Sequence, residues 1–313
     1  MTSLRVCTFE HQGSVAPGLM SGTRVVSLTK AYAQEAIKPP ASLLELMGSL
    51  ESHLSTLDAV ASRFERGDKV LLDASVPLSE VCLKAPLLYP GKIFCAGANY
   101  HDHVVGMVGA EKAGALFSPE LDPYFFLKGE NTVCGTGHPV AIPKGCVKLD
   151  WEVELALVIG RKCRNASVQD AAAYVAGYMV LIDLSARDLS RRPAGYIFPN
   201  DFVAGKAFDD AAPMGPCILL KRPAEAFQEF PLRLFVNDEL KQNSSTAQMI
   251  IKADRQISWL SQRITLNPGD LIATGTPAGA GFETGEFLKA GDIIRAEIEP
   301  IGTILTPIIA QQA

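Results

Sequence analysis

Short apolar runs separated by turn residues dominate the pattern of hydrophobic and polar positions along this chain. Runs of this length, rich in branched side chains, predict strands. Leu232–Val236 is followed by Asn237-Asp238 and then Glu239-Leu240, which predicts a hairpin. Further strands are expected at residues 5–9, 24–28, 93–96, 133–140, 154–159, 178–182, 217–220, 271–274 and 293–298.

Helical spacing of apolar residues occurs in only a few places. It predicts helices near residues 42–47 and 54–64, and another near 253–264. A helix is also expected over 168–176, with Ser167 as its N-cap and Gly177 at its end. Few helices among many strands argue against a doubly wound parallel sheet. The pattern therefore predicts an α+β fold that is mostly β.

A break in the pattern at residues 84–91 indicates a domain boundary. This segment reads Lys-Ala-Pro-Leu-Leu-Tyr-Pro-Gly, and two prolines and a glycine interrupt regular structure. We therefore expect a small α+β domain over residues 1–84 and a larger, mostly β domain over residues 92–313.

Composition and charge narrow the class of protein. The 313 residues are 48% hydrophobic, which supports a large core. The formal net charge is −5 and no basic run occurs, so nucleic acid is not an expected partner. No apolar run suits a membrane span, and the first residues lack the apolar core of a secretion signal. The seven cysteines form no C-x-x-C pair, so we expect reduced thiols and a cytoplasmic protein.

An acidic cluster on an apolar strand is the main candidate site. Side chains alternate along a strand, so Asp150, Glu152 and Glu154 share one face while Trp151 and Val153 occupy the other. Carboxylates directed into a protein repel each other and are costly to desolvate. A hard cation such as Mg²⁺ removes both penalties. For an isolated E-x-E pattern, an exposed sheet edge is the alternative.

A third carboxylate favours the metal hypothesis. Asp183 ends the apolar run 178–182, and with Glu152 and Glu154 it would supply three oxygens to one octahedral ion. Such an ion keeps open positions for a chelating substrate. Hard oxygen ligands favour Mg²⁺ or Mn²⁺ over zinc, with Ca²⁺ as a third option. The alternative for Asp183 is an ion pair with Arg187, four residues on.

Four motifs in this order resemble those of the fumarylacetoacetate hydrolase family. They are G-x-N-Y-x-D-H at residues 97–103, the acidic segment 150–160, the segment 177–188 and T-G-T-P at 274–277. The resemblance extends from residue 92 to the C-terminus. Before residue 92 the chain resembles the small N-terminal domain of longer family members only loosely. It implies a mixed β-sandwich or β-roll of the family type, a divalent metal, a small 2-oxo acid substrate and a homodimer.

The resemblance also implies roles for individual side chains. His103 is similar to the family's general base toward water, and Lys206 to the lysine that stabilises negative charge on the substrate. His101 occupies the variable position of the motif and is left out. Thr276, in the glycine-rich turn 274–281, is expected to hold a substrate carboxylate together with backbone N–H groups.

For each of three further residues, two roles are possible. Arg187 either lies near the metal and substrate or makes a structural ion pair with Asp183 or Asp188. Tyr100 either lines the pocket or packs in the core. Lys128 also matches a family position, but a structural role is preferred for it.

Two positions depart from the family pattern. Gly106 stands where many members carry a glutamate that orients the histidine and raises its basicity. Glu111, Glu120 or a residue from elsewhere in the chain could replace it. Ser190 stands where relatives often carry glutamine, so we expect a larger pocket or different hydrogen bonds to the substrate.

These residues predict a reaction class. The first hypothesis is hydrolysis of a C–C bond in an acylpyruvate, where His103 activates water and a metal stabilises an enolate. The departures at Gly106 and Ser190 raise the alternative of a hydratase, decarboxylase or isomerase acting on 2-oxo acids from aromatic-compound degradation. A protein that only binds an oxo acid ranks lower, because His103 and Lys206 are both present.

Overall fold

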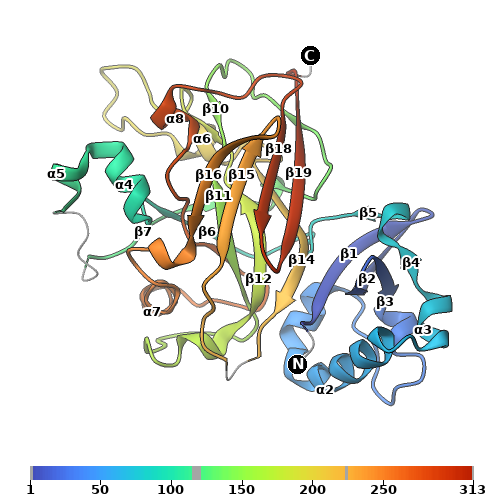
Figure 1. The fold of residues 1–313 in the computed structure, drawn as a ribbon. Coiled ribbons are helices and arrows are strands. Elements are labelled where there is room, and N and C mark those ends of the chain that lie inside the picture. Colours follow the sequence, from blue (N-terminus) through green and yellow to red (C-terminus); the bar gives the residue numbers. More distant parts are fainter. Residues whose placement is uncertain (1–2, 115–120, 223–224, 312–313) are drawn as a thin grey trace.

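The computed structural model describes residues 3–114, 121–222 and 225–311. Within these ranges the fold is α+β and mostly β, as the apolar pattern predicts. A large mixed sheet forms the centre of the molecule, and a smaller sheet covers one of its faces (Figure 1).

Twelve strands of the described residues form the large sheet, and ten of them follow one path. Neighbours along this path are antiparallel except for β17 and β6, which are parallel. In sheet order the ten are β4 (Val76–Pro77), β3 (Arg24–Ser27), β2 (Ser14–Ser21), β1 (Arg5–His11), β14 (Ala212–Leu220), β12 (Val175–Ile182), β11 (Val153–Ile159), β17 (Leu271–Ala273), β6 (Ile93–Gly97) and β7 (Tyr124–Lys128); β5 (Cys82–Leu83) pairs with β1 and β8 (Val133–Cys134) with β14.

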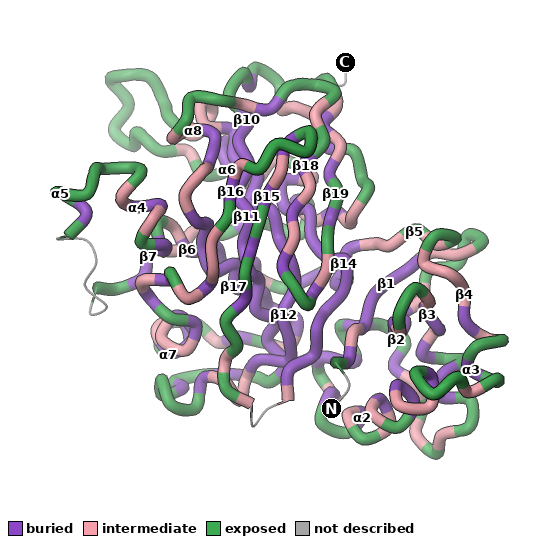
Figure 2. Tube along the Cα trace, in the orientation of Figure 1, coloured by how far each residue is buried: buried purple, intermediate pink, exposed green. Residues whose placement is uncertain are grey.

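A second sheet of five strands packs on the large sheet to form a sandwich. Buried side chains from both sheets, such as Leu155 of β11 and Leu234 of the smaller sheet, form one apolar cluster between them. Figure 2 shows that the central strands are buried along their length. The order of the smaller sheet is β16 (Glu239–Ser245), β15 (Pro231–Val236), β18 (Ile293–Ile298), β19 (Gly302–Ile309) and β9 (Val140–Ala141), and β10 (Leu149–Asp150) pairs separately with β13 (Ser185–Ala186).

The opposite face of the large sheet carries a second apolar cluster. It joins Ala156 and Val158 of β11 to residues of the N-terminal region, including Leu46 and Leu57. The described helices are α1 (Leu28–Ala31), α2 (Leu43–Glu65), α3 (Lys69–Ala74), α4 (His101–Val108), α5 (Ala110–Ala113), α6 (Phe202–Lys206), α7 (Ala253–Arg263) and α8 (Gly281–Thr284), with 3₁₀ turns η1 (Leu78–Glu80), η3 (Glu130–Thr132), η4 (Ala171–Tyr174) and η5 (Thr246–Gln248).

Several predicted elements are confirmed. The hairpin joins β15 to β16 through Asn237 and Asp238, both with positive φ, as a tight two-residue turn requires. Helix α7 matches the prediction for 253–264. The two helices predicted near 42–47 and 54–64 belong to one helix, α2, which has non-helical backbone angles at Ser49.

Two predictions were wrong. Residues 168–176 do not form an α-helix: only the short turn η4 is helical, and Val175 already belongs to β12. Ser167 still accepts a hydrogen bond from the Asp170 amide, so the cap signal reflects a local turn. The single strand predicted over 133–140 is two short strands, β8 and β9, separated by a segment in which Gly137 has positive φ.

No helix among the described residues has the length and apolar character needed to cross a membrane.

Candidate active site

The pairing of β11 with β12 brings the three predicted metal ligands together. Val153 lies opposite Ile182, and the Asp183 amide donates a hydrogen bond to the Glu152 carbonyl oxygen at 2.8 Å. Glu154 is therefore the only one of the three inside a strand, while Glu152 and Asp183 face each other just beyond the strand ends.

Side-chain alternation explains why all three point to one face. In β11, Ala156 and Val158 face the second apolar cluster, and Glu154 lies on the same face because side chains two residues apart in a strand point the same way. In β12, Met179 and Leu181 face the same cluster, and Asp183, two residues after Leu181, lies on that face as well. Two antiparallel strands thus place their acidic residues on the same side of the sheet.

The three carboxylates form a compact, buried group. Glu152, Glu154 and Asp183 each offer an oxygen within 4.8 Å of the others, and none is more than 5% exposed. Burial, reinforced by the charges of Asp183 and Glu152, raises the pKa of Glu154 well above its usual value. The Glu154 carboxylate accepts a hydrogen bond from the Gly275 amide at 2.7 Å, and none of the ion pairs among the described residues includes it. Negative charge is therefore poorly compensated at Glu154.

Two buried lysines contact the cluster. Lys206 Nζ lies 2.5 Å from Glu152 Oε2 and 2.6 Å from Asp183 Oδ2. Lys128 Nζ lies 2.8 Å from Asp183 Oδ1 and donates to the carbonyl oxygens of Leu184 and Ala211. Burial opposes the charge of Lys206, but Asp183 and Glu152 outweigh it and raise the pKa of Lys206. Both lysines are thus bound into the site.

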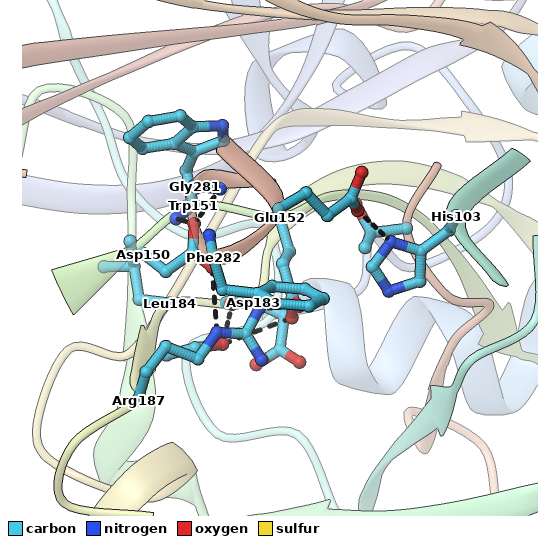
Figure 3. A network of polar contacts seen from close by, with 12 residues as sticks. His103, Asp150, Trp151, Glu152, Asp183, Leu184, Arg187, Gly281 and Phe282 are labelled. Carbon is cyan, nitrogen blue, oxygen red and sulfur yellow. Dashed lines mark hydrogen bonds and ion pairs between the residues drawn. The ribbon is translucent and has the colours of Figure 1, made fainter. Parts of the chain in front are cut away.

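Arg187 bridges two acids. Its Nε donates to Asp150 Oδ2 at 2.8 Å, and its Nη2 contacts Glu152 Oε1. Burial alone would raise the pKa of Glu152, but the charges of Arg187 and Lys206 lower it below its usual value. The alternative ion pair of Arg187 with Asp183 or Asp188 was wrong: among the described residues Arg187 pairs with Asp150 and Glu152, while Asp183 pairs with the two lysines. Arg187 thus lies beside the carboxylate cluster (Figure 3).

His103 has a carboxylate partner that the sequence motif does not contain. His103, in the first turn of α4, is buried, and its Nδ1 lies 2.5 Å from Glu283 Oε1 of α8. Glu111 is exposed on α5, and Glu120 lies outside the described residues. Of the three sources considered for the orienting carboxylate, the described structure supplies one from elsewhere in the chain.

The short helix α8 places two side chains in the site. Phe282 packs its ring 4.5 Å from the Arg187 guanidinium and edge-on against His103, as Figure 3 shows. Asp150 anchors this helix, because its carboxylate accepts hydrogen bonds from the amides of Gly281 at 2.5 Å and Phe282 at 3.1 Å. Asp150 thereby connects Arg187 to the element that carries Glu283.

The predicted substrate-binding residues are less open than expected. The Thr276 hydroxyl donates to the Val153 carbonyl oxygen and accepts from Gln242 Nε2, both at 2.9 Å. The Ser190 hydroxyl donates to the Arg187 carbonyl oxygen at 2.7 Å. Tyr100 is fully buried in the apolar cluster, and its burial raises the pKa of its phenol well above the usual value. In this structure Tyr100 thus packs in the core, the second of the two roles considered for it.

Sequence reasoning missed Glu283, Phe282 and the ion pair between Lys128 and Asp183; the hydrogen bonds of Lys128 to backbone carbonyl oxygens agree with the structural role preferred for it. The missing carboxylate at position 106 was a signal that an acid must come from elsewhere, but no spacing rule identifies which one. For Lys128, the signal was a lone cation on an apolar strand, which needs a buried acid nearby.

The donor set suits a hard divalent cation. Three carboxylates within reach of one ion are the ligand type of Mg²⁺, Mn²⁺ and Ca²⁺. The raised pKa of Glu154 indicates that a further positive charge would stabilise the group.

The two-sheet fold agrees with the comparison to known proteins. Residues 92–309 match the family described as "Fumarylacetoacetate (FAA) hydrolase C-terminal", and the chain belongs to the fumarylacetoacetate hydrolase family. Curated relatives include "Oxaloacetate tautomerase fahd2, mitochondrial" from Xenopus laevis, 34% identical and covering 98% of this chain and 91% of that protein. "Oxaloacetate tautomerase FAHD2B, mitochondrial" from Homo sapiens is 38% identical over 75% of this chain and 71% of that protein.

Solved structures share the whole fold. A probable 2-hydroxyhepta-2,4-diene-1,7-dioate isomerase from Mycobacterium abscessus has a TM-score of 0.77 and 28% identity, with both chains fully covered. Maleylpyruvate hydrolase from Sphingobium sp. SYK-6, in complex with manganese(II) and pyruvate, has a TM-score of 0.74 and 27% identity, covering 98% of this chain and all of that one. The named relatives are thus a tautomerase, an isomerase and a hydrolase.

Proposed function

We propose that this protein is a divalent-metal-dependent enzyme that interconverts the keto and enol forms of a small 2-oxo diacid, with oxaloacetate as the first candidate. The carboxylate cluster next to the His103–Glu283 pair carries the proposal. The curated relatives that are named oxaloacetate tautomerases support it.

Glu152, Glu154 and Asp183 are the residues that would hold the cation. Bound there, a divalent cation would act as a Lewis acid and favour enolisation of a 2-oxo acid. We expect Mg²⁺ or Mn²⁺, since the donors are hard oxygens. The manganese in the maleylpyruvate hydrolase structure supports a divalent ion in this fold.

His103 is the group that would move the proton. Glu283 accepts from Nδ1–H, which leaves Nε2 to carry a proton between the substrate carbon next to the ketone, where the C–H bond breaks or forms, and the enol oxygen, where the O–H bond forms or breaks. The same nitrogen can serve both directions, as a tautomerase requires. Phe282 packs against the His103 ring and limits its rotation.

The charges of the site suit an anionic substrate. The site holds four acids, counting Asp150 with the cluster, and three bases, so its formal charge of about −1 would become about +1 with a divalent cation bound. Lys206 and Arg187 would stabilise the negative charge that develops on the substrate oxygens. This balance favours a 2-oxo diacid over a neutral ketone.

The test follows the ultraviolet absorbance of enol oxaloacetate as it converts to the keto form. The protein is assayed with Mg²⁺, with Mn²⁺ and after removal of metal by EDTA. We expect metal-dependent acceleration that Glu154→Gln abolishes and Glu239→Gln, an exposed control, preserves. Equal rates with and without protein would reject the proposal.

Hydrolysis of an acylpyruvate is the second candidate. The His103–Glu283 pair favours it, since a histidine held by a carboxylate is also suited to activating water. A C–C cleavage would give pyruvate or a related oxo acid and a carboxylic acid. NMR analysis of products from acylpyruvates, oxaloacetate and 2-oxo-alkenoic diacids separates it from tautomerase, hydratase, decarboxylase and isomerase reactions, and binding without any turnover would favour a non-catalytic protein.

Other expectations stay predictions. They include the homodimer, the cytoplasmic location and the division into domains at residues 84–92. Both curated relatives named above have "mitochondrial" in their names. Thr276 and Ser190 would contact substrate only if they exchanged the hydrogen bonds described above, so their substrate-binding roles are also retained as proposals.

A further inference from the structure

A pocket of about 180 Å³ opens between the two sheets beside the first turn of α7. Leu155 and Leu157 of β11 and Tyr178 of β12 line it, together with Met249 and Ala253. All five side chains are buried in the apolar cluster between the sheets. Helix α7 lies at the lower end of the molecule in Figure 1, whereas α6 and α8 of the candidate active site lie at the upper end.

This pocket and the carboxylate cluster lie on opposite faces of the large sheet. Leu155 directly follows Glu154 in β11, and neighbouring side chains of a strand point to opposite faces. Leu155 belongs to the cluster between the sheets, whereas Glu154 shares the face of Ala156. The pocket is therefore separate from the site proposed to bind the metal.

Tyr178 brings a polar group into this apolar lining. The residue is 1% exposed, and none of the hydrogen bonds among the described residues reaches its hydroxyl. Burial raises the pKa of the phenol to about 12, and the Gln228 amide opposes this only in part. A backbone amide can only donate, so the hydroxyl hydrogen is left without an acceptor, which is unfavourable in apolar surroundings. Thr246 also lines the pocket, but its hydroxyl already accepts a hydrogen bond from the Phe230 amide at 2.8 Å.

Charged side chains border the opening of the pocket. They are Glu229, Lys252 and Asp254. Lys252 donates to the Ala247 carbonyl oxygen, and Asp254 accepts from the Arg255 amide, both at 2.7 Å. Two acids stand against one lysine and a helix N-terminus with about half a positive charge, so the groups that line the opening provide no positive excess. The pocket is therefore poorly suited to a carboxylate or a phosphate.

We propose that this pocket is a second binding site, and that its ligand is a small neutral molecule with an apolar body and one oxygen that accepts a hydrogen bond from Tyr178. An apolar cavity of roughly 150 Å³ holds a benzene ring, so a six-membered ring that carries a single oxygen matches the volume. Leu155, Leu157 and Met249 contact the body of the ligand, and the Tyr178 hydroxyl binds its oxygen. A cyclic ketone has this chemistry, because its oxygen accepts and it carries no charge.

The first experiment locates the binding of one probe, cyclohexanone. Protein labelled with ¹³C in its methionine methyl groups is titrated with the ketone and followed by NMR, with Mg²⁺ present. The Met249 signal, assigned with Met249→Leu, should shift with a dissociation constant of about 1 mM or lower. The Met179 signal should not shift, because Met179 faces the other side of the sheet. An unchanged Met249 signal would overturn the proposal, as would tighter binding of cyclohexanecarboxylate, which has the same ring and a negative charge.

The second experiment tests the role of the hydroxyl group. Tyr178→Phe removes only that group and should weaken cyclohexanone binding by about 5–10-fold. Toluene, a ring of similar size without oxygen, should bind the wild type and Tyr178→Phe equally. Tyr32→Phe is the matched control, since it removes another buried hydroxyl without a described hydrogen bond, far from this pocket in the other apolar cluster. Equal affinity of the wild type and Tyr178→Phe for the ketone would overturn the proposal.

A third variant fills the pocket. Ala253→Leu adds bulk from the first turn of α7 with a residue that favours helices, and should abolish the binding of both rings. Thermal unfolding followed by circular dichroism shows whether this variant is folded; if it is not, the comparison of Tyr178→Phe with Tyr32→Phe decides. Ketone binding that Glu154→Gln weakens and Tyr178→Phe does not would place the ligand at the carboxylate cluster and overturn the proposal. None of these measurements requires turnover, so their outcome is independent of the proposed function.

Discussion

The Nζ atom of Lys206 lies 2.6 Å from Asp183 Oδ2, so an ammonium group stands against two of the three carboxylates proposed to bind a metal. A lysine in this position has two opposing effects. It lowers the repulsion between the acids, and it repels an arriving cation. The affinity of the site for metal is therefore a balance that Lys206 sets.

Replacing Lys206 by methionine should tighten metal binding and slow the reaction. Removal of the positive charge is expected to increase Mn²⁺ affinity by about 10-fold or more. Loss of a cation that stabilises substrate charge should lower kcat by roughly 10²-fold. Isothermal titration calorimetry measures the first effect, with Lys241→Met as a control away from the carboxylate cluster. Weaker Mn²⁺ binding would show that Lys206 mainly organises the ligands.

Glu154→Gln should have opposite effects on stability and on metal binding. The raised pKa of Glu154 means that its charge is unfavourable in the folded, metal-free protein. Glutamine removes that charge and should increase the free energy of unfolding at pH 8 by about 1–2 kcal/mol. The same change should weaken Mn²⁺ binding by at least roughly 100-fold. Urea denaturation with EDTA and calorimetry with Mn²⁺ give the two values, and a loss of both would contradict this account.

Metal binding should depend on pH through Glu154. Its pKa is higher in the folded protein than in the unfolded chain, so the folded state binds more protons between the two values. The stability of the metal-free protein should accordingly fall as pH rises from the usual glutamate pKa through the folded value.

Metal affinity should change in the opposite direction, because a cation needs the ionised carboxylate. We expect affinity for Mn²⁺ to increase over the same pH range, with release of a proton on binding. Calorimetry in buffers of different ionisation enthalpy measures that proton. If Glu154→Gln still releases a proton on binding Mn²⁺, the proton comes from another group.

Asp150→Ala should destabilise the protein more than an exposed substitution does. Asp150 is fully buried, and its loss would leave the Gly281 and Phe282 amides and the Nε–H of Arg187 without this acceptor. We expect a decrease of about 2–4 kcal/mol in the free energy of unfolding. Urea denaturation followed by circular dichroism checks this, with the exposed Asp73→Ala on α3 as control. Equal midpoints for the two variants would refute the anchoring role.

The sequence allowed the convergence of the acids to be predicted, because it depends on local rules. Alternation along one strand placed Glu152 and Glu154 on one face, and the end of another apolar run supplied Asp183. Antiparallel pairing in the observed register then brought them together. The mostly β fold followed from similar short-range patterns.

The partner of His103 could not be predicted in the same way. Glu283 is 180 positions away in the chain, and only the packing of α4 against α8 brings the two together. The wrong helix over 168–176 has a related cause. Ser167 and Asp170 make a real local turn, but Val175 joins the central sheet, where burial and ladder hydrogen bonds outweigh a weak helical signal.

The junction between β1 and β14 determines what would happen to a shortened chain. Val6 pairs with Ile218 at this junction, so the N-terminal strands extend the central sheet. A chain that began at residue 92 would present the open backbone of β14 to water beside newly uncovered apolar side chains. Sheet edges of this kind recruit strands from other molecules and aggregate. We therefore expect the first strands of the protein to limit such aggregation.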